Sequence, residues 1–201
     1  MKIIELFPQT VGQFNLDRSL TNDELESLQG KDVRIGFGGN AVTADSYILK
    51  DPKLKDLKSF IDKCVAEYAE CTVSPNDNVS FRVTQSWVTY TKKGQHHQRH
   101  FHANSVISGV FYIKTDSEKD KIHFYKDKLP HIAITPKKLN YFNTYSWWLP
   151  SLQGTLYLFP SSLEHSVEAV ENDDVRIALA FNTFPVGTIG NQIELSELLI
   201  L

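Results

Sequence analysis

The hydrophobic and polar residues of this chain change their spacing near residue 78. Within residues 54–71 the apolar side chains recur at helical spacing, so this segment is predicted to form an amphipathic helix that docks through one face. Residues 1–50 instead read as short strands and loops, with one helical turn that Thr21 can cap ahead of acidic residues. From residue 78 onward, short runs rich in β-branched and aromatic residues predict strands.

The predicted strands are separated by Gly, Pro, Asn and Asp, and they lie near 79–90, 107–113, 121–125, 131–134, 154–159, 165–170 and 175–183. Because no helices alternate with them, they favour an antiparallel double sheet of the jelly-roll type. The chain has 201 residues with no repeat and no linker, so we expect one domain. Within this domain we expect helices that support the sheets in residues 1–77, a β core in residues 78–185 and a tail in residues 186–201.

The strand predicted at 175–182 is informative on both faces, because side chains alternate along a strand. One face carries the bulky apolar residues Val175, Ile177, Leu179 and Phe181. The other face carries one arginine, two alanines and one asparagine: Arg176, Ala178, Ala180 and Asn182. We expect the bulky face to pack against the 54–71 helix. The second face should line a cavity between the sheets, where the alanines leave room for a small ligand.

Three histidines form the candidate site. His100 and His102 precede an apolar run, and residues two apart in an extended segment point to the same face. Together with the distant His165 they could hold one face of a divalent metal ion and leave other positions open. Arg176 in a closed cavity requires a carboxylate partner, which its guanidinium binds bidentately. A metal with open positions and an arginine some distance away suit a dicarboxylic 2-oxo acid, which the metal chelates at one end and the arginine binds at the other.

These stretches resemble the 2-oxoglutarate- and Fe(II)-dependent dioxygenases of the prolyl-hydroxylase-like group, in a branch common among bacterial and cyanophage-type sequences. The resemblance spans residues 79–183 and rests on the His100, Phe101, His102 run, on 104–113, 154–161 and 176–182, and on His165. It implies a double-stranded β-helix fold that works with Fe(II), 2-oxoglutarate and O₂ and releases succinate and CO₂.

The resemblance also implies roles for individual residues. It makes His100 and His165 iron ligands and Arg176 the partner of the distal carboxylate of 2-oxoglutarate. The other residues expected at the cosubstrate are Tyr90, Tyr112 and Asn182. Two alternatives stay open: Tyr90 and Tyr112 could be packing aromatics, and Arg176 could belong to an ion pair in the core.

One position departs from the family pattern. The usual motif is His-x-Asp or His-x-Glu, and His102 stands where the carboxylate belongs. Three neutral imidazoles would leave the iron site one charge unit more positive, yet they could still bind the metal. Alternatively, Asn104 or a water supplies the third ligand and His102 orients a neighbouring group.

The sequence therefore predicts an enzyme, a 2-oxoglutarate-dependent dioxygenase that hydroxylates a substrate it does not identify. One alternative is a cupin-like metal-binding protein without oxidative turnover. Another is a jelly-roll interaction protein with a vestigial histidine cluster. The histidines expected at the surface or in satisfied buried positions are His96, His97, His123 and His131.

Composition and charge restrict the possible binding partners and the cellular location of the protein. The net charge of −3 and the pI near 6.2 do not indicate a nucleic-acid partner. No apolar run reaches the roughly 18 residues that span a membrane, and no signal peptide is recognisable. Cys64 and Cys71 are too few for a disulfide framework, so a cytoplasmic location is expected. The sequence leaves the oligomeric state open.

Overall fold

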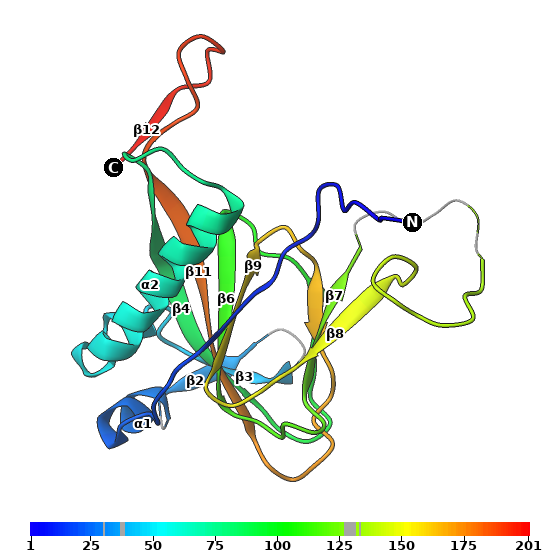
Figure 1. Ribbon diagram of the computed structural model, residues 1–201. Coiled ribbons are helices and arrows are strands. Elements are labelled where there is room, and N and C mark those ends of the chain that lie inside the picture. Colours follow the sequence, from blue (N-terminus) through cyan, green and yellow to red (C-terminus); the bar gives the residue numbers. More distant parts are fainter. Residues whose placement is uncertain (30, 37–38, 127–131, 133) are drawn as a thin grey trace.

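The structure is a computed structural model that describes residues 1–29, 31–36, 39–126, 132 and 134–201 (Figure 1). Its helices are α1 (Asn22–Leu28) and α2 (Lys55–Thr72), with 3₁₀ turns at Ile48–Lys50 and Pro52–Leu54. Its strands are β1 (Gly12–Asn15), β2 (Val33–Ile35), β3 (Ala41–Thr43), β4 (Ser80–Thr91), β5 (His97–His100), β6 (Ile107–Lys114), β7 (Lys121–Tyr125), β8 (Ser146–Pro150), β9 (Thr155–Pro160), β10 (His165–Val167), β11 (Arg176–Ile189) and β12 (Leu198–Ile200).

The strands form two sheets. The larger sheet has the order β1-β9-β6-β11-β4-β3-β2, with β12 added to the end of β11, and the smaller has the order β5-β10-β7-β8. The mainly β character with supporting helices is confirmed, as are the short strands expected within residues 1–50. The strand predicted at 131–134 falls largely outside the described residues. Strand β11 runs to Ile189, beyond the predicted end of the β core, because the tail folds back and pairs with it as β12.

Helix α1 begins at the predicted cap. The Thr21 hydroxyl accepts from the backbone N–H of Glu24 at 3.2 Å, and the Glu24 carboxylate accepts from the N–H of Thr21 at 2.8 Å. These reciprocal bonds satisfy two N–H groups that have no partner within the helix. Arg18 then donates two hydrogen bonds to Glu24, both at 2.7 Å, so the helix start is tied to the preceding loop.

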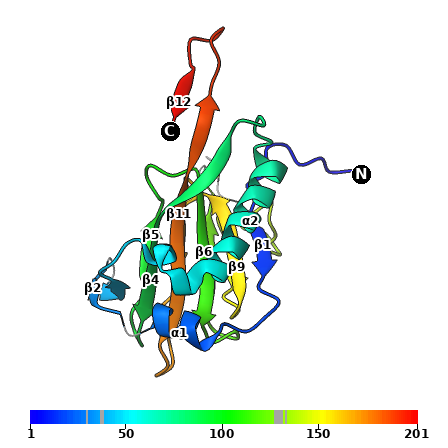
Figure 2. The same ribbon diagram turned by 90° about the vertical axis from the view of Figure 1, so that its left-hand side faces the viewer.

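Helix α2 covers one face of the large sheet (Figure 2). Its buried face includes Leu57, Ile61 and Val65, and these share one apolar core with β11 residues. The strand contributes Ile177, Leu179 and Phe181. The prediction that the helix packs on the bulky face of this strand is therefore confirmed. No helix in the described part of the chain is long and apolar enough to cross a membrane.

A second core lies on the opposite face, between the two sheets. The large sheet contributes Tyr112, Tyr157, Phe159 and Ala178, and the small sheet contributes Ile122 and Phe124 of β7. Strand β11 therefore separates a helix-covered core from an inter-sheet space. The candidate site opens into that second space.

We expect Ile61→Ala to lower the free energy of unfolding by about 2–5 kcal/mol, because Ile61 is fully buried on the sheet-facing side of α2 and truncation leaves a cavity. Urea denaturation measures the change. Lys63→Ala, exposed on the same helix, is the matched control and should change the free energy by less than about 0.5 kcal/mol. Equal effects of the two substitutions would contradict the docking of α2 on the sheet.

Candidate metal centre

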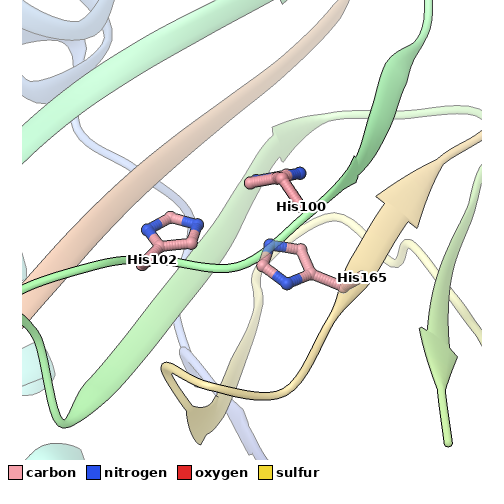
Figure 3. A group of neighbouring side chains, drawn as sticks. All are labelled: His100, His102 and His165. Carbon is pink, nitrogen blue, oxygen red and sulfur yellow. The ribbon is translucent and has the colours of Figure 1, made fainter. Parts of the chain in front are cut away.

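The three predicted histidines converge on one space (Figure 3). His100 ends β5, His165 begins β10, and the two residues face each other in the antiparallel pairing of these strands. His102 follows β5, where its backbone N–H donates to the carbonyl of Ser161 at 2.9 Å. The candidate ligand nitrogens all lie within 4.8 Å of one another. The structure thus brings together residues from two segments that are distant in the sequence.

Hydrogen bonds at Nδ1 fix the tautomers of two of these imidazoles. His100 Nδ1 lies 2.7 Å from the carbonyl oxygen of Gln98, and His165 Nδ1 lies 3.0 Å from that of Leu163. A carbonyl oxygen only accepts, so Nδ1 carries the proton in each neutral ring. Nε2 of both rings then presents a lone pair, as a metal ligand requires.

His102 is oriented by a side chain. Its Nδ1 lies 2.6 Å from Oδ1 of Asn182, which also accepts from the Ser108 hydroxyl at 2.9 Å. The Ser108 hydroxyl oxygen lies 2.8 Å from that of Ser161, and the Ser161 hydroxyl donates to Ser105 at 2.7 Å. Because Asn182 Oδ1 only accepts, His102 donates through Nδ1 and its Nε2 also carries a lone pair. The structure thus places Asn182, which we expected at the cosubstrate, against a candidate metal ligand.

Asn104, the alternative third ligand, lies apart from this arrangement. It sits in an exposed turn with a left-handed backbone, φ 54°. His102, by contrast, is a member of the histidine cluster.

The environment keeps the cluster neutral. Burial, together with the nearby His100, lowers the pKa of His165 to about 3 and that of His102 to about 4. Burial also lowers the pKa of His100 itself. Since metal ions bind neutral imidazole, the cluster needs no deprotonation before it can take up a cation near neutral pH.

A pocket extends from the cluster along β11. The lining includes Arg176, Ala178 and Ala180, so the prediction that this face lines a cavity between the sheets is confirmed. Tyr112 lines the same pocket, and its buried hydroxyl makes no hydrogen bond with the residues that the structure describes. Burial raises the pKa of this hydroxyl, and the nearby Ser151 offsets only part of the rise. The hydroxyl is therefore a protonated donor, and the nearby Ser151 hydroxyl also lacks a hydrogen-bond partner among the described residues.

Arg176 already has a carboxylate partner within the chain. Its Nη1 donates to Oδ1 of Asp120 at 2.8 Å, and both side chains are buried. Its Nη2 donates to the backbone carbonyl of Glu168 at 3.1 Å. The expected need for a carboxylate is met by Asp120, a partner that the sequence did not indicate. These contacts account for two of the five N–H donors of the guanidinium, so donors remain for a ligand.

Tyr90 is not brought to the pocket. Its hydroxyl donates to the carbonyl of Leu28 at 2.6 Å, and its ring packs against the helix-covered core. Strand alternation explains this position, because Tyr90 shares a face with the fully buried Val88. The neighbours on the other face, Thr89 and Thr91, line the pocket instead.

Two aromatic residues of the pocket were not anticipated. His97, expected in an ordinary surface or satisfied position, lines the pocket, and its ring stacks on that of His100 at 4.3 Å between centroids. His97 reaches this position because β5 is irregular: His100 pairs with His165, but His97 pairs with Val167. Three residue steps on β5 thus match two on β10, which brings His97 to the same face as His100. Trp87 stacks on His102 at 5.9 Å.

Two other histidines lie outside the cluster. His96 is exposed, as expected. His123 Nε2 lies 2.9 Å from the Glu168 carboxylate, but this buried nitrogen makes no hydrogen bond with the described residues, so the expected satisfied position is not observed. His131 lies outside the described residues.

Comparison with known proteins points to one family. Residues 85–182, which contain the histidine cluster and Arg176, match the family model described as "Putative 2OG-Fe(II) oxygenase". No curated protein matches the chain.

Three solved structures show the likeness of fold. The non-heme alpha ketoglutarate dependent epimerase SnoN from nogalamycin biosynthesis matches at a TM-score of 0.65 with 13% identity, over 89% of this chain and 81% of that one. A prolyl hydroxylase from Trichoplax adhaerens matches at 0.58 with 15% identity, over 87% and 83%. A Pseudomonas putida prolyl-4-hydroxylase matches at 0.54 with 12% identity, over 87% and 92%. Over residues 85–182 the chain is similar to the 2-oxoglutarate- and Fe(II)-dependent oxygenases, as the resemblance of its sequence predicted. Its fold is similar to those of the solved structures.

Proposed function

We propose that this oxygenase hydroxylates its substrate at an iron ion held by His100, His102 and His165. The observation that carries the proposal is the orientation of the three imidazoles. Each donates through Nδ1 to an acceptor that only accepts, so three Nε2 lone pairs are available to one cation. We take His102, rather than Asn104, as the third ligand, because Asn104 lies in an exposed turn.

The donor set fits Fe(II). Imidazole nitrogen is a ligand that suits this ion, and three ligands on one face leave positions for a chelating cosubstrate and O₂. Three neutral ligands leave the full double charge of the ion uncompensated by the protein. A dianionic cosubstrate such as 2-oxoglutarate would balance that charge.

The pocket fits the other end of 2-oxoglutarate. Arg176 offers N–H donors beyond those that Asp120 and Glu168 occupy, and the unpaired Tyr112 hydroxyl offers one more. Both residues line the pocket that contains the histidines. We therefore assign the distal carboxylate to Arg176 and Tyr112.

The positions of these residues indicate what each group contributes to the reaction. When bound, iron and 2-oxoglutarate supply the oxidative chemistry, in which the cosubstrate becomes succinate and CO₂ and one oxygen atom enters the substrate. Arg176 and Tyr112 orient the cosubstrate, and Asn182 holds His102 in its ligating tautomer. Apolar walls that include Ala178 and Ala180 limit the access of water.

The proposal extends to the architecture and the compartment. We take the two sheets as the halves of a double-stranded β-helix, a jelly roll, in one domain; the likeness of fold to the solved oxygenases supports this. The free thiols of Cys64 and Cys71 support a reducing, cytoplasmic environment. We assign neither a membrane nor a nucleic acid as a partner.

A second candidate is a cupin-like metal-binding protein without oxidative turnover. Two observations favour it: an imidazole in place of the usual carboxylate ligand, and an arginine already paired with Asp120. Consumption of 2-oxoglutarate in the absence of a substrate separates the two candidates. The oxygenase consumes it slowly with Fe(II) and O₂, whereas the binding protein does not.

We expect His165→Ala to abolish the Fe(II)–2-oxoglutarate complex, because it removes one of three metal ligands. Anaerobic titration of the wild-type protein with Fe(II) and 2-oxoglutarate should give the weak visible charge-transfer band of that complex. His96→Ala, which removes an exposed histidine outside the cluster, is the matched control and should retain the band. Metal bound to the wild type with no band would overturn the oxygenase proposal in favour of the cupin-like binder.

We expect Arg176→Lys to raise the dissociation constant of 2-oxoglutarate about tenfold, equivalent to about 1.4 kcal/mol. An ammonium can preserve the charge opposite Asp120, but it cannot bind a second carboxylate through a planar fork. Isothermal titration calorimetry on Zn(II)-loaded protein measures the constant without turnover. Arg82→Lys, on an exposed part of β4, should leave it unchanged. An unaltered constant in Arg176→Lys would mean that Arg176 serves only its ion pair.

We expect the metal-free protein to become less stable as the pH falls from about 6.5 to about 4. In the unfolded chain histidines titrate near about 6.5, whereas burial lowers the pKa of His165 to about 3 and that of His102 to about 4. Between these values the unfolded chain binds more protons, so the free energy of unfolding decreases as the pH decreases.

Urea denaturation at about pH 7 and about pH 5 measures this loss of stability. His165→Gln removes one of the titrating groups and should reduce the loss, whereas His96→Gln, at an exposed position, should not change it. If His165→Gln lost as much stability at low pH as the wild type, the result would contradict a lowered pKa of His165.

A further inference from the structure

Asn40 is a buried polar residue that the proposed function does not use. It immediately precedes β3 and is 1% exposed. Neither its Nδ2 nor its Oδ1 has a hydrogen-bond partner among the described residues. Leaving such a group buried and unpaired costs about 1–3 kcal/mol, so an unpaired amide in a folded protein requires an explanation.

The location of Asn40 suggests that explanation. Its side chain lines the same pocket as the three histidines and Arg176. The pocket extends across β4, whose Thr89 and Thr91 lie between β3 and the arginine-bearing strand. Asn40 therefore borders the proposed reaction site on the β3 side of the large sheet.

The backbone around Asn40 is anchored although its side chain is not. The carbonyl of Asn40 accepts from the N–H of Gly36 at 2.7 Å, and the next residue, Ala41, pairs with Tyr90. A Cβ on Gly36 would lie 3.0 Å from Asn40 Oδ1 and 2.8 Å from a methyl group of Val42, so the chain packs closely here. The amide is held by its backbone, which is the arrangement of a group preorganised for a ligand.

The chemistry of the amide restricts the ligand. An asparagine side chain presents two N–H donors beside one acceptor oxygen. A carboxylate of 2-oxoglutarate could satisfy Nδ2 but not Oδ1, and Arg176 and Tyr112 already suit that group. Both atoms are satisfied together by a ligand with an N–H next to a C=O, which pairs with the amide edge to edge.

We propose that Asn40 binds the substrate of this oxygenase and that the substrate carries an amide or lactam edge at that position. The inference rests on the proposed function, because it assigns the histidines and Arg176 to the metal and the cosubstrate. It makes Asn40 a specificity-determining residue of the same pocket.

A matched pair of probes tests the proposal. 2-Pyrrolidone has an N–H beside its carbonyl, whereas N-methyl-2-pyrrolidone lacks the donor. Both are titrated into ¹⁵N-labelled protein loaded with Zn(II) and 2-oxoglutarate, and the shifts of the protein signals give the dissociation constants. We expect 2-pyrrolidone to bind at least about fivefold more tightly than its N-methyl analogue, as the net gain of one or two hydrogen bonds implies.

Asn40→Leu, of similar side-chain size, should bind both probes equally, whereas the surface control Asn76→Leu should retain the difference. Without ligand, Asn40→Leu should have a melting temperature equal to or above that of the wild type, because the amide has no protein partner to lose. A purely structural asparagine would give a lower one.

Three results would overturn the proposal: equal binding of the two probes to the wild type, a difference that survives in Asn40→Leu, or a tenfold weaker binding of 2-oxoglutarate in that variant. The third result would place Asn40 in the cosubstrate site. Failure of the proposed function looks different, because the wild type would then not bind 2-oxoglutarate at all. Discrimination between the pyrrolidones would in that case still support amide recognition by Asn40.

Discussion

The alternation of side chains along β11 is the constraint on which the rest of the structure depends. One face of this strand is bulky and apolar and is buried by α2. The other carries Arg176 and two alanines, which line the pocket, and Asn182, whose side chain contacts His102. Because a shift of one residue would exchange the faces, the pairing of β11 with β4 and β6 sets the helix packing and the site together. The packing of the core and the position of the candidate site therefore both depend on the register of β11.

The sequence predicts most reliably those features that depend on local spacing. The cap at Thr21, the α2 helix and the two faces of β11 each follow from a pattern within about 20 residues. His100 and His102 were placed together for the same reason. His165 was added as a distant third imidazole for one metal ion, and the resemblance to a family supported it. The prediction that Tyr90 lies at the cosubstrate was wrong, and the sequence itself could have corrected it. Strand alternation puts Tyr90 on the same face as Val88, and Thr89 and Thr91 on the opposite face.

Other features depend on contacts between distant segments, and no local pattern contains them. Asp120 reaches Arg176 from 56 residues away, and the intervening chain shows no sign of this pairing. His97 reaches the pocket because β5 has one residue step more than the paired part of β10, which is a property of the pairing and not of either strand. Asn40 becomes significant only when burial shows that both amide atoms lack a partner. The roles of such residues can be recognised only in the three-dimensional structure.

The charges of the pocket explain how an imidazole can replace the usual carboxylate. Asp120 compensates Arg176 within the chain, so this pair adds no net charge to the pocket. Fe(II) on three neutral imidazoles would then carry its full charge of two, which one dianionic cosubstrate neutralises. With a carboxylate ligand and the same ion pair, the loaded site would have a net negative charge in a largely buried space, where an uncompensated charge is unfavourable. A neutral loaded site in turn suits an uncharged substrate group, and an unpaired amide such as that of Asn40 is a neutral partner for it.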